Sequence, residues 1–194
     1  MALVILFCFV SCGTGQNKEK EFEYANSAYE KLVVAANLCE AMMDVVYAAG
    51  VYAVYQSDNM LGYSQINRFA KAIGMTYDEV MAGMNAYGLD KDDYCDLSKA
   101  TPAMQIASAA LIKNGTCAKV EEYMSEAKDE LKQVTADYAD YTGYPTLKTF
   151  YSEISSYLEF IKNPSVSFSQ VETTVNAYET NIRTYKNDLN FIFE

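Results

Sequence analysis

The chain of 194 residues contains no histidine and no tryptophan. Histidine is the side chain whose ordinary pKa lies nearest neutral pH, and it is also the commonest metal ligand in proteins. Its absence excludes Ser-His-Asp and Cys-His catalysis, the usual zinc sites and the Glu-x-x-His di-iron site of ferritin-like bundles. No other spacing of acidic or nucleophilic residues suggests an active site. We therefore expect no enzyme activity, no metal and no cofactor.

Positive charge is also scarce, because 15 Lys and Arg face 26 Asp and Glu, a net charge of -11. Such a field repels phosphate backbones and anionic lipid headgroups, so we expect no nucleic-acid partner. Hydrophobic residues make up 51% of the chain and charged residues 21%. This balance is typical of a folded protein, and we expect one domain over residues 19–194.

The N-terminus carries an apolar run, "ALVILFCFV", over residues 2–10. Its length suits the central region of a signal peptide and falls far short of the ~20 residues that a helix needs to cross a bilayer. A buried strand or helix is the alternative, against which the turn formers and charges of "GTGQNKEKE" argue. We expect residues 1–12 to be an export signal and residues 13–18 a flexible tether.

The tetrapeptide "FVSC" at residues 9–12 resembles the lipobox of bacterial lipoproteins. The resemblance implies that Cys12 is acylated and becomes the first residue of a membrane-anchored protein. Ordinary signal-peptidase cleavage is the alternative, with Ser11 and Gly13 as the small residues near the cut, and it implies free secretion. Both interpretations place the protein outside the cytoplasm, and a lipid would be its one contact with the membrane.

Apolar residues recur at spacings of three and four over four long stretches, which predicts long helices. The predicted helices cover residues 18–57, 117–141, 147–161 and 168–192. This pattern indicates an all-α fold, a bundle of about four long antiparallel helices. The charge-free stretch "VVYAAGVYAVY" within the first helix suits a covered central helix better than a membrane span, since Glu40 and Asp44 precede it. Gly50 should permit a close approach of another helix or a mild bend.

Residues 58–115 differ from the rest, since they form shorter amphipathic pieces that each end at a glycine. Thr76 and Glu79 have the spacing of a capping box at a helix start. We expect a short-helix insertion between the first and second long helices, and irregular parts of bundles often make their specific contacts.

Two clusters of acidic residues have the composition of a site but lack its spacing. The stretch "LDKDDYCD" at residues 89–96 fails the pattern of a calcium loop, because Cys95 stands where glycine is needed. The acidic residues of "KVEEYMSEAKDE" alternate with lysines and avoid the apolar stripe. They indicate the solvated face of a helix rather than catalytic carboxylates.

Three cysteines follow the leader. Cys39 falls on the apolar stripe of the first helix and should be a buried thiol. Cys95 and Cys117 flank the last short helix of an exported chain, so we expect a disulfide between them. There is no Cys-x-x-Cys motif, which argues against a redox enzyme.

The most unusual feature of the composition is its 17 tyrosines and 9 methionines. They suit a core of bulky side chains, or alternatively the lining of a cavity for an apolar ligand. The lining would consist of Met42, Met81, Met84, Met104 and Tyr178. The sequence thus favours an exported, non-catalytic binding or interaction protein of unknown partner. The alternative is a secreted carrier of an apolar small molecule held between the helices.

Overall fold

The structure is a computed structural model, and it describes residues 12–56, 63–89, 100–134 and 143–193. This part of the chain contains seven helices and no strand, so the predicted all-α class is confirmed. The helices are α1 (Cys12–Gln56), α2 (Tyr63–Ala72), α3 (Tyr77–Ala86), α4 (Ala100–Lys113), α5 (Thr116–Leu131), α7 (Gly143–Lys162) and α8 (Phe168–Phe193).

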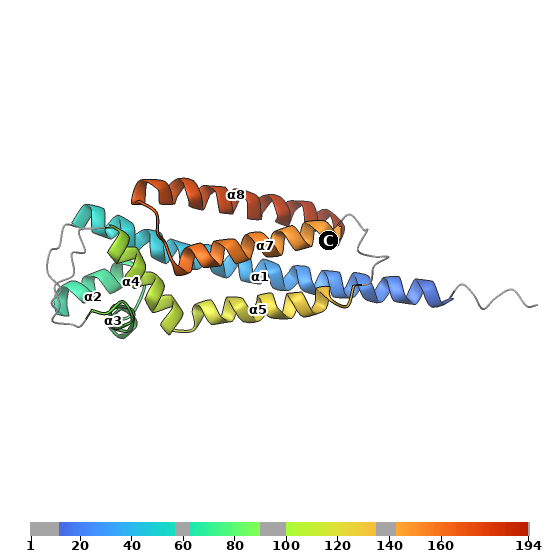
Figure 1. Cartoon of the computed structure of the whole chain (residues 1–194), viewed down its shortest axis with the longest axis horizontal. Coiled ribbons are helices and arrows are strands. Elements are labelled where there is room, and N and C mark those ends of the chain that lie inside the picture. The colour runs from blue at the N-terminus through green and yellow to red at the C-terminus, as the bar shows by residue number, and fades with distance from the viewer. Residues whose placement is uncertain (1–11, 57–62, 90–99, 135–142, 194) are drawn as a thin grey trace, which may run out of the picture.

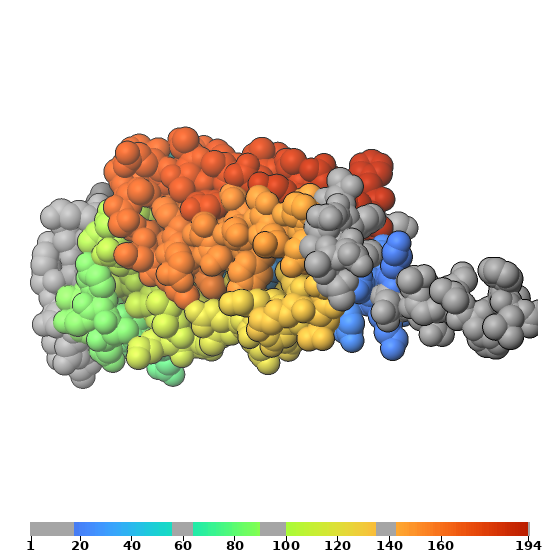
Figure 2. Space-filling model, turned by 45° about the vertical axis from the view of Figure 1, so that its right-hand side comes forward, coloured from blue at the N-terminus to red at the C-terminus, as the bar shows by residue number. Residues whose placement is uncertain are grey.

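The longest helix, α1, runs through the length of the molecule, and α5, α7 and α8 lie along it (Figure 1). The chain direction alternates, because α5 and α8 return toward the end from which α1 and α7 set out. The short helices α2, α3 and α4 gather around the C-terminal end of α1. Figure 2 shows α7 between α5 and α8 on one face.

The apolar stripe of α1 forms the centre of the core. Leu32, Ala35, Cys39 and Val46 are completely buried, as the spacing predicts, and they lie among α4, α5, α7 and α8. By length and composition alone, the stretch Lys18–Tyr55 could cross a membrane, a test that core helices and signal sequences also pass. In the structure 44% of this apolar window is buried, on the side that packs against α4, α5, α7 and α8.

Two glycines allow helices to approach closely. A Cβ atom on Gly50 of α1 would lie 2.6 Å from the ring of Phe168 and 3.2 Å from Met104 Sδ, which confirms the predicted close approach. A Cβ atom on Gly83 of α3 would lie 2.5 Å from the carbonyl oxygen of Ile106 in α4. The insertion therefore packs α3 against α4 backbone to backbone.

Helix ends follow the local sequence in some places and depart from it in others. The capping box is confirmed, since the Glu79 amide donates to Thr76 Oγ1 at 3.2 Å and the Thr76 amide donates to the Glu79 carboxylate at 2.8 Å. The predicted tether over residues 13–18 is helical, because extending a helix that already exists is far cheaper than starting one. Helix α5 ends at Leu131, ten residues before the predicted end at Tyr141. The last seven of these residues lie outside the described part.

Candidate functional site

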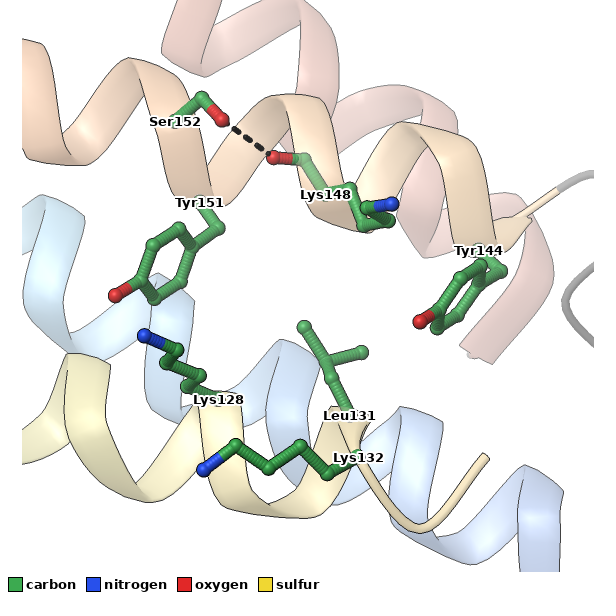
Figure 3. Close-up of a pocket in the computed structure, with 7 residues that line it drawn as sticks. All are labelled: Lys128, Leu131, Lys132, Tyr144, Lys148, Tyr151 and Ser152. Carbon is green, nitrogen blue, oxygen red and sulfur yellow. Dashed lines mark hydrogen bonds between the residues drawn. The ribbon is translucent and has the colours of Figure 1, made fainter. Parts of the chain in front are cut away.

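A hollow on the described surface lies between α5 and α7, and we name it the lysine pocket (Figure 3). It has a volume of about 250 Å³. Its lining consists of Lys128, Leu131, Lys132, Tyr144, Lys148, Tyr151 and Ser152. Three of the chain's 15 basic residues therefore meet at one place in a strongly acidic protein.

The register of the two helices explains why these side chains meet. Lys128 of α5 and Lys132, the residue that caps its C-terminal end, stand four residues apart, and Leu131 lies beside them on the edge of the apolar stripe. Residues at such spacings share one side of a helix. Across the gap, Tyr144, Lys148 and Tyr151 recur at spacings of four and three on α7.

The floor of the lysine pocket is apolar and aromatic. Leu131 is only 8% exposed and points into the space between the helices, flanked by the rings of Tyr144 and Tyr151 (Figure 3). Both tyrosines are half-buried. Such a floor excludes water from the body of a ligand while the phenol hydroxyls stay available for hydrogen bonds.

The rim carries the positive charge. Lys132 Nζ donates to Asp129 Oδ1 at 2.6 Å, and this bond, together with the charge of the lysine, holds the pKa of Asp129 below its ordinary value. Lys148 Nζ lies 5.7 Å from the centre of the Tyr144 ring, a cation–π distance. Lys128 extends from α5 toward Tyr151 (Figure 3). Neither Lys128 nor Lys148 makes a salt bridge to a carboxylate that the structure describes.

Chemically, the lysine pocket can bind but lacks a catalytic pair. It contains no carboxylate and no thiol, and its one hydroxyl outside the tyrosines, that of Ser152, donates to the backbone oxygen of Lys148 at 3.0 Å. Lysine ammonium groups over an apolar floor suit an anion with an apolar body. Among the described residues, no group of three His, Cys, Asp or Glu side chains is placed to hold a metal ion.

The residues predicted to line an apolar cavity lie elsewhere. Met42, Met84 and Met104 are buried in the core, on α1, α3 and α4 respectively, while Met81 and Tyr178 pack against its edge. None of these five residues lines the lysine pocket. In the sequence, that pocket was indicated only by lysines and tyrosines at matching spacings on two separate helices. Spacing within one helix cannot reveal which neighbour that side will face.

The cysteines are only partly covered by the structure. Cys39 and Cys117 are buried free thiols, as expected for Cys39, and the Cys117 thiol contacts Met42 Sδ at 3.9 Å. Burial, and after it the neighbouring Cys117, raise the pKa of Cys39 to about 12. No disulfide occurs within the described ranges. Cys95 lies outside them, so its predicted bridge to Cys117 stays a prediction.

The acidic stretches fall in different places. The stretch at residues 90–96 lies outside the described residues. On α5, Glu121, Glu122, Glu126 and Asp129 are exposed, which confirms the predicted solvated face, whereas Glu130 is half-buried and accepts from Lys31 of α1 at 3.3 Å.

Comparisons of the chain with protein-family models, with curated proteins and with solved structures find no match.

Proposed function

We propose that this chain is an exported, non-catalytic binding protein that holds a small organic anion in the lysine pocket. The observation that carries the proposal is that Lys128 and Lys148, which make no salt bridge to a described carboxylate, line one hollow with an apolar floor in a chain of net charge -11. A solvated lysine face would scatter its charges along one helix. Here two helices bring the charges to one hollow.

The ligand we propose is a carboxylate with one ring or a short alkyl chain. A volume of about 250 Å³ is small for a ligand pocket, which limits the apolar body to roughly that size. The rings of Tyr144 and Tyr151 offer faces for stacking. A purely apolar molecule would leave the lysines without a function in binding, so the proposed ligand class differs from that of the alternative hypothesis, a carrier of an apolar molecule.

The same proposal includes the architecture and the location of the protein. The long helices α1, α5, α7 and α8 form the bundle proper, and α2, α3 and α4 form the insertion. The N-terminal end of α1 projects beyond the neighbouring helices, so a lipid on Cys12 would attach at the end farthest from the insertion (Figure 1). We propose lipid anchoring through Cys12 in the cell envelope, with free secretion as the alternative.

A calorimetric titration of the full chain with 3-phenylpropionate tests the binding proposal. The matched ligand is 3-phenylpropylamine, which has the same apolar body and the opposite charge. We expect saturable binding of the acid and none of the amine. Equal binding of both, or binding of neither, would contradict the proposed site.

Paired variants assign the binding to the lysine pocket. Lys128→Gln with Lys148→Gln should weaken binding at least about tenfold, because a hydrogen bond to a charged group contributes about 1.5–3 kcal/mol. The control is Lys113→Gln with Lys119→Gln, which removes the same charge from exposed positions on α4 and α5 outside the pocket. An equal loss in both pairs would show a general effect of charge.

The intact mass of the mature protein, from membrane and soluble fractions of its native host, tests the location. A membrane-bound species that starts at Cys12 and carries acyl mass is the expected result. A soluble species that starts near Gly13 would support secretion, and a species that retains residues 1–11 would contradict export.

A further inference from the structure

The lysine pocket has two ends that resemble each other. At one end, Lys128 of α5 extends toward Tyr151 of α7 (Figure 3). At the other end, Lys148 of α7 lies over the ring of Tyr144, with 5.7 Å between its Nζ atom and the ring centre. Leu131 lies between the two ends, in the middle of the floor. Each end thus offers one ammonium group and one phenol hydroxyl, and apolar surface separates the two ends.

The directions of the two helices explain why the charges separate. Helix α5 runs opposite to α7 (Figure 1). Because helical side chains lean toward the N-terminus of their own helix, a lysine on α5 and a lysine on α7 reach in opposite directions along the pocket. Tyr144 and Tyr151, which mark the ends, stand seven residues apart on α7, about 10 Å along its axis. The two ammonium groups are therefore two separate binding points.

The third lysine of the pocket is engaged elsewhere. Lys132 Nζ donates to Asp129 Oδ1 at 2.6 Å, and its side chain runs along α5 rather than toward α7 (Figure 3). Lys128 and Lys148, in contrast, make no salt bridge to a described carboxylate. The described chain thus leaves one uncompensated positive charge at each end of the pocket.

The donors at each end suit a carboxylate. An ammonium group has three hydrogen-bond donors and a phenol hydroxyl has one, whereas an ionised carboxylate only accepts. Hydrogen bonds between such groups are stronger than those between neutral groups, because the acceptor is charged. Tyr144 and Tyr151 are half-buried, so their rings also shield the body of a ligand from water.

We propose that the ligand of the lysine pocket is a dicarboxylate, with one carboxylate at each end of a short apolar spacer. The inference rests on the proposed binding of an organic anion and adds a second charge to that ligand. One carboxylate accepts hydrogen bonds from Lys128 and Tyr151. The other accepts from Lys148 and Tyr144, and the spacer lies over Leu131. One ring or a short alkyl chain suffices as the spacer, since the hydrogen bonds themselves cover part of the separation of about 10 Å.

Three acids with the same apolar body test the second charge. They are 3-phenylpropionate, its para-carboxyl derivative, which carries the charges at opposite ends, and its ortho-carboxyl derivative, which carries both near one end. In calorimetric titrations of the full chain at low ionic strength, the para diacid should bind at least about fivefold more tightly than 3-phenylpropionate. The ortho diacid should gain less than about twofold, because its second carboxylate cannot reach the other end of the pocket.

The outcomes separate this inference from the proposed function. Equal gains for the two diacids would overturn the inference, because attraction by net charge alone would explain them. Binding of all three acids with one affinity would overturn it as well and would leave the binding of an organic anion intact. Failure of all three acids to bind would contradict both proposals.

Single variants assign the gain to the two lysines. In Lys128→Gln and in Lys148→Gln, the para diacid should bind within about twofold of 3-phenylpropionate, since either change leaves one end without its charge. The control is Lys119→Gln, which removes the same charge from an exposed position of α5 outside the pocket and should keep the gain. All three lysines are exposed, so thermal unfolding should find the variants folded. A gain that survives in either pocket variant would show that the second carboxylate lies elsewhere and would overturn the assignment.

Discussion

Replacement of Tyr157 by phenylalanine should stabilise the free protein. The hydroxyl oxygen is buried and finds no partner among the described residues, so it lost its bonds to water on folding without compensation. Mutational data put that cost at about 1–3 kcal/mol, and the small void left by the oxygen returns part of it. We expect a net gain of about 1–2 kcal/mol. In a domain of this size, this gain corresponds to a rise in Tm of about 2–8 °C.

The assay is urea unfolding followed by circular dichroism, with Tyr55→Phe as the control. Tyr55 is 77% exposed, so its hydroxyl stays hydrated and the change should be within about 0.5 kcal/mol. The folded-state pKa of Tyr157 lies above its ordinary value of 10.0, so the unaltered chain loses stability as the pH rises above 10. The advantage of Tyr157→Phe should therefore grow there. A loss of more than about 1 kcal/mol at neutral pH would refute the reasoning, because it would mean that the hydroxyl is hydrogen-bonded.

The remaining predictions concern packing, capping and the thiols. Gly83→Ala should destabilise the protein by about 1–3 kcal/mol in thermal unfolding, because its Cβ would meet the Ile106 backbone, which cannot move aside as a side chain can; a gain in stability would contradict the contact. Hydrogen bonds from Thr76 and Asn114 lower the pKa of Glu79. Glu79→Ala should therefore be destabilising above pH 4.5 and should match the unaltered chain in stability once the pH falls below the folded-state pKa. A difference in stability that persists at low pH would show that these hydrogen bonds to the carboxylate are not the cause. Peptide mapping after alkylation should find Cys39 modified only in denaturant, because its thiol is buried, and labelling of Cys39 in the folded chain would contradict that burial.

Much of the helical core follows from spacing alone. Leu32, Ala35 and Cys39 stand three and four residues apart, and all three are completely buried. The reason is physical, since a helix that must bury one side needs its apolar residues at that period. The close approach at Gly50 is one of the two roles that the sequence left open for this glycine, the other being a mild bend.

Helix ends and sites were harder to predict. The apolar stripe of α5 continues in the sequence beyond Leu131, yet the helix ends there, so periodicity does not determine where a helix stops. The lysine pocket depends on how α5 and α7 are rotated about their axes. When α5 is considered alone, Lys128 belongs to its solvated face. Lys128 lines a pocket only because Tyr151 of the neighbouring helix lies across from it.

The depressions between α1 and α8, which Asp44 and Glu179 line, were missed for the same reason. Asp44 and Glu179 are far apart in the sequence, and each is an ordinary exposed-face residue by the pattern of its own helix. Their proximity depends on the packing of α1 against α8.

The most direct test of the central claim is to locate a bound anion on the full chain by amide chemical shifts. Nuclear magnetic resonance spectra of the ¹⁵N-labelled protein would be recorded during a titration with 3-phenylpropionate. The account predicts saturable shifts concentrated on Leu131, Tyr144, Tyr151 and their neighbours in α5 and α7. Shifts centred on other helices, or an unchanged spectrum at saturating acid, would contradict the claim that the lysine pocket is the binding site.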